Sequence, residues 1–410
     1  DAVAILKGLA PEFEKFHKVR YDDPAIEAAV DLSSRYIQDK RLPDKAIDVI
    51  DEAGAKQALA ELTDVKVEEI RDIVTGMARV PKESVDRDDR SALKELDVRL
   101  KQKVFHQDQA VDAVSRSIRL ARAGLRSVER PIGSFLFMGP TGVGKTELAK
   151  QLAKVLGVSF QRFDMSEYAE EYSVSRLIGS APGYVGYDQG GVLTEAINRN
   201  PHSVLLLDEI EKAHPRIFNL LLQVMDHGAL TDNHGRKVDF RHVILIMTSN
   251  VGAADMAKRK PGFSDGLTFG DGEVEMKRLF PPEFRNRMDA VVRFAPLPFE
   301  AMLPIVDKLV VELEGNLASK KVRIRLTDSA RAWFAKKGYE PAMGARPMAR
   351  VLRQELSEKL AEEILYGALE DGGVAVVDAP GGADGKLAFS FEPLPVEGAD
   401  AVGGEVVEVG

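Results

Sequence analysis

A glycine-rich loop that follows a buried strand constrains this chain more than any other feature. The apolar run Ser134–Met138 is typical of a strand, and the residues after it read GPTGVGKT. Gly139, Gly144, Lys145 and Thr146 fill the pattern of a phosphate-binding loop between a strand and a helix. The glycines let backbone N–H groups face phosphate oxygens, and the helix adds the positive end of its dipole. The loop predicts that a nucleotide binds here.

Two side chains of the loop have their own predicted roles. Lys145 is expected to reach the β- and γ-phosphates, and the Thr146 hydroxyl is expected to bind Mg²⁺. A glycine-rich turn that matches the pattern by chance is the alternative. The predicted nucleotide-binding residues of this loop are Gly139, Pro140, Thr141, Gly142, Val143, Gly144, Lys145 and Thr146.

Polar side chains follow two further apolar runs. In SVLLLDEIEKAH, Asp208 would hold Mg²⁺ directly or through water, and Glu209 would polarise the water that attacks the γ-phosphate. The run Val243–Met247 leads to Asn250, whose neutral amide would orient that water. Glu209 and Asn250 are therefore predicted catalytic residues. The alternatives are that the two carboxylates cap the next helix and that Asn250 begins an ordinary loop.

The composition narrows the class of partner and the compartment. Acidic residues number 65 against 56 basic ones, for a net charge of -9, and no block of like charge suggests a nucleic-acid partner. The chain has no cysteine, which excludes disulfides and thiolate metal sites and is compatible with a cytoplasmic location. No apolar run approaches the roughly 20 residues of a membrane helix. Because the chain begins at Asp1 without a signal pattern, it reads as a fragment that begins mid-protein.

The hydrophobic pattern predicts an α/β fold with helical regions on both sides in sequence. Phe135–Met138, Val204–Leu207 and Val243–Met247 are continuous apolar runs, as expected for strands buried on both faces of a parallel sheet. The expected domains are a helical domain at 1–79, a linker at 80–92, a large α/β domain at 93–300, a small helical domain with two weak strands at 301–392, and a flexible acidic tail at 393–410.

Three further motifs lie in order along the chain: LPDKAIDVIDEAGA at Leu42–Ala55, QRFDMSEY at Gln161–Tyr168 and GARPMAR at Gly344–Arg350. Together with the phosphate loop, they make the chain resemble the AAA+ ATPases, and more closely the Clp unfoldase family. The resemblance implies an AAA+ P-loop fold with a parallel sheet between helices, and ATP/ADP and Mg²⁺ as cofactors. Residues 1–79 then look like the helical lid of an incomplete first module, and residues 93–392 look like a complete second module.

The resemblance also assigns roles to residues outside the loop. Arg287, in PEFRNRMD, matches the catalytic finger that reaches the γ-phosphate held by a neighbouring subunit. Arg346, in GAR, matches the lid arginine that contacts the nucleotide of its own subunit. Val104 and Phe105 look suited to packing against adenine, although His106 stands where relatives usually have glycine. On sequence alone, each arginine would be interpreted as a solvent-exposed charged residue on a helix.

The segment SAPGYVGYDQGG combines flanking glycines with aromatic residues that a soluble loop would rarely carry. In the family this loop lines a central pore, which makes Tyr184 the residue that grips substrate, with Val185 beside it. Tyr184 could instead pack into the domain core. A second pore-facing segment is expected within Thr231–Asp239.

The sequence also bears on the branch of the family. Residues 53–77 leave no room for the coiled-coil or hairpin insertions of other branches, which favours the ClpA branch. The segment KRKPGFSDGLTF lies where peptidase-binding members carry a docking loop, with Pro261, Gly262 and Phe263 at its tip. Pro261 departs from the aliphatic residue that usually begins this tip.

The resemblance implies a homo-hexameric, ATP-driven unfoldase that threads protein substrates into a ClpP-type peptidase. Adaptors would bind through the missing N-terminal region. The chain carries no peptidase motif of its own, such as G-x-S-x-G or H-E-x-x-H. The alternative is a remodelling or disaggregating chaperone that uses the same motor and binds no peptidase.

Overall fold

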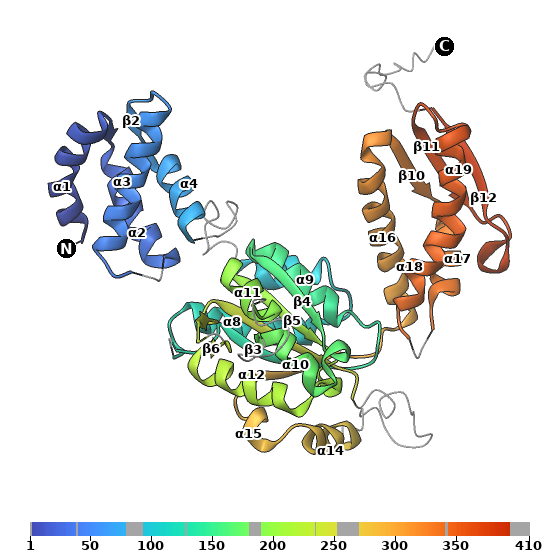
Figure 1. Cartoon of the computed structure of the whole chain (residues 1–410). Coiled ribbons are helices and arrows are strands. Elements are labelled where there is room, and N and C mark those ends of the chain that lie inside the picture. Colours follow the sequence, from blue (N-terminus) through green and yellow to red (C-terminus); the bar gives the residue numbers. More distant parts are fainter. Residues whose placement is uncertain are drawn as a thin grey trace, which may run out of the picture. The chain divides into compact units, whose positions relative to one another are not determined.

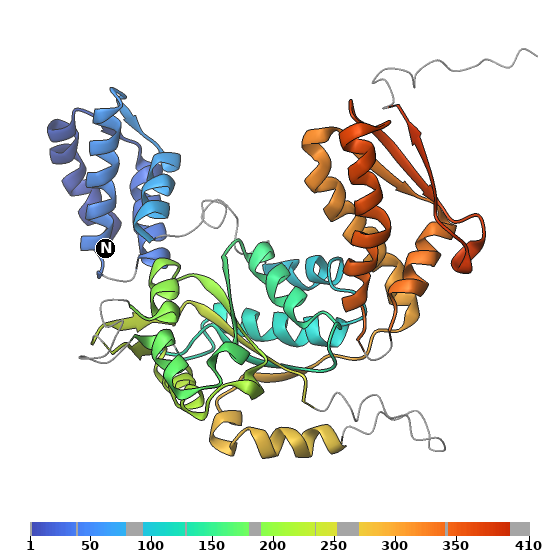
Figure 2. The same cartoon turned by 45° about the vertical axis from the view of Figure 1, so that its right-hand side comes forward.

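The computed structural model describes residues 2–37, 40–78, 93–127, 129–179, 190–233, 235–251, 270–340 and 343–393. The chain divides into two compact units, whose elements are shown in Figures 1 and 2. The first runs up to Phe294 apart from loop residues 140–143, and the second contains those residues and nearly everything from Ala295 onward. The predicted linker at 80–92 and residues 394–410 of the predicted tail lie outside the described residues.

The first unit begins with a small helical bundle. Helices α1 (Ala2–His17), α2 (Asp23–Tyr36), α3 (Asp44–Leu59) and α4 (Val67–Ala78) pack around a common apolar core. Two short strands, β1 (Arg20–Tyr21) and β2 (Asp64–Val65), pair in parallel. Leu6, Ile50 and Ile70 are fully buried in this core. The helical pattern predicted for this region is confirmed.

A five-stranded sheet with the order β4-β5-β8-β3-β9 forms the centre of the α/β part. Its strands are β3 (Gly133–Met138), β4 (Ser159–Asp164), β5 (Ser203–Asp208), β8 (Val243–Ser249) and β9 (Ala290–Arg293), and all pair in parallel. The three predicted apolar strands are confirmed as β3, β5 and β8. They occupy the middle of the sheet, where both faces are buried. The edge strands β4 and β9 are partly exposed, so their sequences lack the apolar run that revealed the others.

Helices cover both faces of this sheet (Figure 1). On one face, α8 (Asp108–Arg122) contacts β3 and β9, and α9 (Lys145–Leu156) contacts β4, β5 and β8. The other face packs into a core with α10 (Glu171–Ile178), α11 (Val192–Arg199), α12 (Pro215–His227) and the short α15 (Pro282–Arg285). The remaining elements of this part are α7 (Leu96–Lys101), α14 (Gly270–Leu279), the 3-10 helices η1 (Met165–Tyr168) and η2 (Ile210–Lys212), and an antiparallel hairpin of β6 (Ala229–Thr231) and β7 (Lys237–Asp239).

The second unit combines helices with a three-stranded sheet. Its helices are α16 (Met302–Leu317), α17 (Asp328–Gly338), α18 (Arg346–Leu352) and α19 (Glu358–Tyr366), with a π-helical turn at Arg353–Ser357 between the last two. The predicted strands are confirmed as β11 (Gly373–Asp378) and β12 (Ala388–Glu392). An additional strand, β10 (Val322–Leu326), pairs in parallel with β11.

No helix in the described ranges is long and apolar enough to cross a membrane. The fold class predicted from the sequence is confirmed: a parallel α/β sheet between helices, a helical C-terminal region with a small sheet, and a helical N-terminal bundle.

Two histidines stack at the amino ends of central strands. His202 precedes β5 and His242 precedes β8, and their ring centroids lie 4.7 Å apart at an interplanar angle of 24°. Burial lowers the pKa of His202 to about 3, and the neighbouring His242 and Arg122 act in the same direction. Burial also lowers the pKa of His242. The folded sheet therefore holds this pair in its neutral form.

The pair predicts that stability falls as the solution becomes acidic. Between about pH 6.5 and pH 3 the unfolded chain binds a proton at His202 that the folded chain does not, so the free energy of unfolding rises with pH in this window. Its slope should approach about 1.4 kcal/mol per pH unit below pH 6.5. Urea unfolding from pH 7.5 to pH 5 should show this slope, reduced in His202→Gln. His106 is exposed, so His106→Gln is the control; equal slopes in both variants would contradict the assignment.

Candidate functional site

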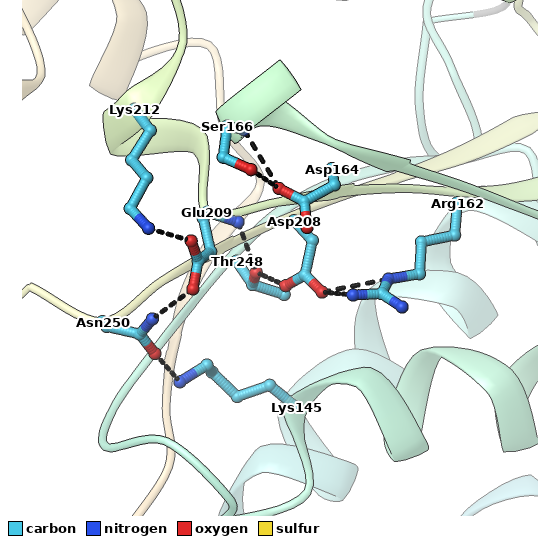
Figure 3. A network of polar contacts seen from close by, with 9 residues as sticks. All are labelled: Lys145, Arg162, Asp164, Ser166, Asp208, Glu209, Lys212, Thr248 and Asn250. Atoms are coloured by element: carbon cyan, nitrogen blue, oxygen red, sulfur yellow. Dashed lines mark hydrogen bonds and ion pairs between the residues drawn. The ribbon is translucent and has the colours of Figure 1, made fainter. Parts of the chain in front are cut away.

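The carboxyl edge of the sheet gathers most of the polar residues singled out in the sequence. Gly139 follows β3, Asp208 ends β5, and Asn250 follows β8. Because β8 lies between β5 and β3 and all three run in parallel, these ends are neighbours in space. Lys145, Asp208, Glu209 and Asn250 consequently meet in one polar network (Figure 3).

The phosphate loop has the backbone geometry that its glycines predict. Gly139 and Gly144 adopt positive φ angles of 151° and 103°, and Gly144 is the N-cap of α9. A side chain at Gly139 would also collide with the main chain, since a Cβ there would lie 2.6 Å from the Phe294 carbonyl oxygen. Tip residues 140–143 group with the second unit, where the Ala345 N–H donates to the Gly142 oxygen at 3.1 Å.

Lys145 is buried at the first residue of α9. Its ammonium group donates to the Gly139 carbonyl oxygen at 2.5 Å and to Asn250 Oδ1 at 2.8 Å. Burial lowers the pKa of Lys145 to about 8, against the opposing attraction of Asp208, Glu211 and Glu209. Phosphate oxygens would favour the charged ammonium further, because an opposite charge nearby raises the pKa of an amine.

Asp208 is held from two sides. The Arg162 guanidinium on β4 donates to Asp208 Oδ2 through Nε at 3.1 Å and through Nη2 at 2.8 Å. The Thr248 hydroxyl on β8 donates to Asp208 Oδ1 and accepts the Glu209 N–H at 3.1 Å. Residues from both neighbouring strands thus fix the carboxylate, which leaves little freedom in its direction.

Glu209 occupies a left-handed backbone conformation, with φ 54° and ψ 50°, at the turn that leaves β5. Its carboxylate accepts from Asn250 Nδ2 at 3.3 Å and pairs with Lys212 Nζ. The Asn250 N–H in turn donates to Glu211 Oε1 at 3.1 Å. Asn250 therefore contacts both the lysine of the phosphate loop and the predicted catalytic carboxylate, with one side-chain atom for each. An unusual backbone conformation at such a position is typical of functional sites.

Sequence reasoning did not identify four members of this network: Arg162, Glu211, Lys212 and Thr248. Thr248 stands two residues before Asn250, and a hydroxyl at the end of a buried strand was the available signal. Arg162 lies in the QRFDMSEY motif but had no partner until β4 and β5 were paired. Lys212 lies three residues after Glu209, a spacing that brings side chains together on one helical turn.

The residues predicted to hold Mg²⁺ have suitable chemistry. Thr146 supplies a hydroxyl oxygen from the start of α9, and Asp208 supplies carboxylate oxygens from the end of β5. Magnesium prefers oxygen ligands and is commonly bound through one or two protein groups plus substrate phosphates. In the described part of the chain, no three His, Asp or Glu side chains are arranged to form a metal cage by themselves.

The predicted adenine contacts lie beside the loop. Val104 is buried, and its Cγ1 would lie 3.6 Å from a Cβ placed on Gly144. Phe105 is partly buried next to it. An apolar surface therefore adjoins the loop, as the packing of an adenine base requires.

Known families match almost the whole chain. Residues 130–291 match an AAA domain (Cdc48 subfamily), residues 1–103 an AAA lid domain, and residues 297–377 the C-terminal, D2-small domain of ClpB protein. The ClpA homolog protein of Fuscovulum blasticum is 57% identical over 92% of this chain and 48% of its own length. The chain belongs to the Clp/Hsp100 family of AAA+ proteins.

Two further similarities extend over nearly the same region. The ATP-dependent Clp protease ATP-binding subunit ClpC of Staphylococcus aureus (strain USA300) is 40% identical over 93% of this chain and 55% of its own length. A solved Hsp104-ADP complex of S. cerevisiae aligns with a TM-score of 0.80 and 37% identity, covering 92% of this chain and 66% of the other. The chain thus spans about half the length of the curated relatives it matches. As an AAA+ protein, it binds nucleotide.

The two arginines predicted by likeness to this AAA+ family lie in different units. Arg287 follows α15 in the first unit, and its guanidinium contacts Asp226 and the Glu283 carbonyl oxygen. Arg346 is the first residue of α18 in the second unit, and its N–H donates to the Met343 oxygen at 3.2 Å. Neither role is tested by these contacts, and both remain predictions.

The remaining predicted residues of the Clp-like loops lie outside the described residues: Tyr184, Val185, Pro261, Gly262 and Phe263. The second predicted pore segment is described except at position 234 and corresponds to the β6–β7 hairpin. At its turn, Asn233 donates to the Ile178 oxygen at 3.1 Å and to the Gly179 oxygen at 2.5 Å. The hairpin is thereby tied to the residue that precedes the predicted pore loop.

Thr248 gives a direct test of this network. Thr248→Val keeps the shape of the side chain but leaves one Asp208 oxygen and the Glu209 N–H without their hydroxyl partner. We expect the ATPase kcat to fall about tenfold or more, because a lost partner for a buried charged group costs roughly 1–3 kcal/mol. Thr248→Ser, which restores the hydroxyl, should recover most of the rate. Equal rates in the serine and valine variants would contradict the role of the hydroxyl.

Proposed function

We propose that this chain is the motor part of an ATP-dependent protein unfoldase. In this proposal it hydrolyses ATP at the subunit interfaces of a homo-hexameric ring and threads protein substrates into a ClpP-type peptidase. The observation that carries the proposal is the network in which Asn250 contacts both Lys145 of the phosphate loop and the Glu209 carboxylate. These contacts support the proposal because hydrolysis of ATP needs a cation that binds phosphate beside a carboxylate that polarises water.

Nucleotide binding is assigned to the phosphate loop and the start of α9. Lys145 and the backbone N–H groups of the loop bind phosphate oxygens, and Val104 and Phe105 receive the base. Thr146 and Asp208 would hold Mg²⁺, which when bound supplies positive charge to the β- and γ-phosphate oxygens. Arg162 and Thr248 keep the Asp208 carboxylate in a fixed direction for that purpose.

Hydrolysis is assigned to the other end of the network. Each carboxylate oxygen of Glu209 can accept more than one hydrogen bond, so its contacts with Asn250 and Lys212 still leave room to bind a water molecule. Asn250 orients that water without adding charge. Arg287 of an adjacent subunit and Arg346 of the same subunit offset the negative charge that develops on the transferred phosphoryl group.

Glu209→Gln tests the hydrolytic role. The amide retains the shape of the carboxylate but cannot polarise water as strongly, so we expect ATP to bind with little loss while turnover falls at least a hundredfold. Binding of a fluorescent ATP analogue and phosphate release should be measured separately. Glu167→Gln, at an exposed acid near the same edge of the sheet, is the control. Unchanged phosphate release in Glu209→Gln would remove Glu209 from the mechanism.

Substrate handling is assigned to Tyr184 and Val185, with the β6–β7 hairpin as a second contact. The contacts of Asn233 at the hairpin turn support this assignment, because they connect the hairpin to the start of the predicted pore loop. We propose that adaptors bind outside the region spanned by this chain, which covers about half the length of its curated relatives. We further propose the cytoplasm as the compartment, since an ATP-driven motor requires ready access to ATP.

The peptidase partner rests on sequence likeness. The ClpA homolog protein is 57% identical, and the ClpC relative is by name a subunit of an ATP-dependent Clp protease. Pro261, Gly262 and Phe263 supply an apolar tip within a charged segment, which suits insertion into an apolar pocket on a partner.

Phe263→Ala tests this docking assignment in the full-length protein. Removing a buried aromatic anchor costs roughly 2 kcal/mol or more per contact, and a ring repeats the contact several times. We expect ATPase and unfolding rates to be retained while degradation of a tagged substrate by added ClpP-type peptidase is lost. Phe269→Ala, an aromatic change in the same segment, is the control. Degradation at the wild-type rate in Phe263→Ala would rule out this tip as the anchor.

A chaperone that binds no peptidase is the second candidate. It is favoured by the match of residues 297–377 to the small domain of ClpB protein and by the similarity to the Hsp104 structure. The two candidates share every residue of the nucleotide site. They separate when wild-type protein, ATP, substrate and peptidase are mixed, since only the first candidate degrades the substrate.

A further inference from the structure

Arg287 is not a loose surface arginine. Its Nε donates to Asp226 Oδ2 at 2.5 Å, and its Nη1 donates to the Glu283 carbonyl oxygen at 3.0 Å. The side chains of Arg287 and Asp226 are 29% and 32% exposed, so the pair is partly shielded from water. Asp226 lies in the last turn of α12, far from Arg287 in sequence.

The main chain around Arg287 is fixed independently of Asp226. Arg130 donates to the Arg287 carbonyl oxygen at 3.2 Å and, through Nε, to the Met225 oxygen of α12 at 2.8 Å. Two residues further on, Asp289 pairs with Arg126 at 2.7 Å, and both side chains are only 16% exposed. The backbone on this side of the finger is therefore anchored. The Arg287 side chain is directed by Asp226 at Nε and by Glu283 at Nη1, where the carbonyl oxygen accepts a hydrogen bond and the carboxylate lies 3.7 Å away.

Helix α15, which precedes Arg287, lies beside α12 (Figure 1), and aromatic side chains pack between them. Phe218 of α12 contacts Phe280 and Phe284 with ring centroids 5.9 Å and 5.1 Å apart, and Phe280 stacks on Phe284. Exposed ion pairs usually contribute little because ordering two long side chains costs entropy. Here the short Asp226 side chain projects from a helix already held in place, so that cost is small.

We propose that Asp226 is a positioning residue for Arg287. Its carboxylate holds Nε, the Glu283 carbonyl holds Nη1, and Nη2 has no partner within the described ranges. The outer nitrogen is thus presented to a phosphate oxygen on an adjacent copy of the chain, with the guanidinium plane already fixed. Preorganised donors of this kind stabilise charge that develops in a transition state more than charge in the ground state. The inference rests on the proposed finger role of Arg287.

The experiment uses assembled full-length protein. Asp226→Ala should lower kcat about tenfold and leave the KM for ATP within about twofold, because it loosens a group that acts mainly in the transition state. Asp226→Asn, which keeps the shape but weakens the hydrogen bond, should fall between Asp226→Ala and wild type. Glu171→Ala is the matched control. Like Asp226, Glu171 is an acid paired with an arginine, but its partner Arg216 lies at the opposite end of α12.

Two further measurements separate positioning from a structural role. Asp226→Ala combined with Arg287→Ala should be no slower than Arg287→Ala alone, because the acid then has nothing to orient. In mixed rings with Lys145→Ala subunits, Asp226→Ala subunits should regain turnover, since the neighbour supplies an intact finger. A structural defect in the Asp226→Ala subunit would persist in both experiments.

Each remaining outcome overturns the inference in a recognisable way. If Arg287→Ala retains wild-type turnover, the finger role itself fails and the role of Asp226 fails with it. If Arg287→Ala is slow but Asp226→Ala is as fast as wild type, only the positioning role fails. Faster turnover in Asp226→Ala would show that the acid restrains the finger. Loss of ring assembly in both Asp226 variants would make the residue an assembly residue instead.

Discussion

The carboxamide of Asn250 holds the candidate site together. Its oxygen accepts from the buried Lys145 ammonium, while its nitrogen donates to the Glu209 carboxylate. A neutral group between a cation and an anion satisfies both without neutralising either, which leaves the lysine available to phosphate and the glutamate available to water. A carboxylate in place of Asn250 would compete with phosphate for Lys145 and repel Glu209. An amide suits this position because its oxygen accepts a hydrogen bond from the lysine while its nitrogen donates one to the glutamate.

This contact depends on strand order rather than on distance along the chain. Asn250 can reach both partners only because β8 is inserted between β5 and β3, and all three strands end at the same edge of the sheet. The central strands are apolar on both faces, so the two helical layers bury them and fix their relative positions. Because the strands are fixed, the polar residues at their ends are also held in fixed positions, as a catalytic site requires.

The sequence predicted a residue's role best where that role can be recognised from neighbouring residues in the chain. The phosphate loop, the central strands and the positions of Asp208, Glu209 and Asn250 follow from runs and spacings that can be read within a few residues. Arg162, Thr248 and Asp226 could not be assigned in this way, because each acts on a residue of another element. Arg162 needed the pairing of β4 with β5, and Asp226 needed the packing of α12 against the segment that carries Arg287.

Helix α12 connects the candidate nucleotide site with Arg287, the residue proposed to act as a finger. It begins shortly after the turn that carries Glu209 and Lys212, where the His214 N–H donates to the Tyr168 oxygen. It ends at Asp226, which holds the finger proposed to act on a neighbouring copy. The 13 residues of α12 therefore connect the segment after the Glu209 turn with the partner of Arg287. If Asp226 orients Arg287, α12 is one route between the turn after Glu209 and the finger. The pairing of β3 with β9 is a second route, because the Asp289 N–H, two residues after Arg287, donates to the Ser134 oxygen of the strand that leads into the phosphate loop.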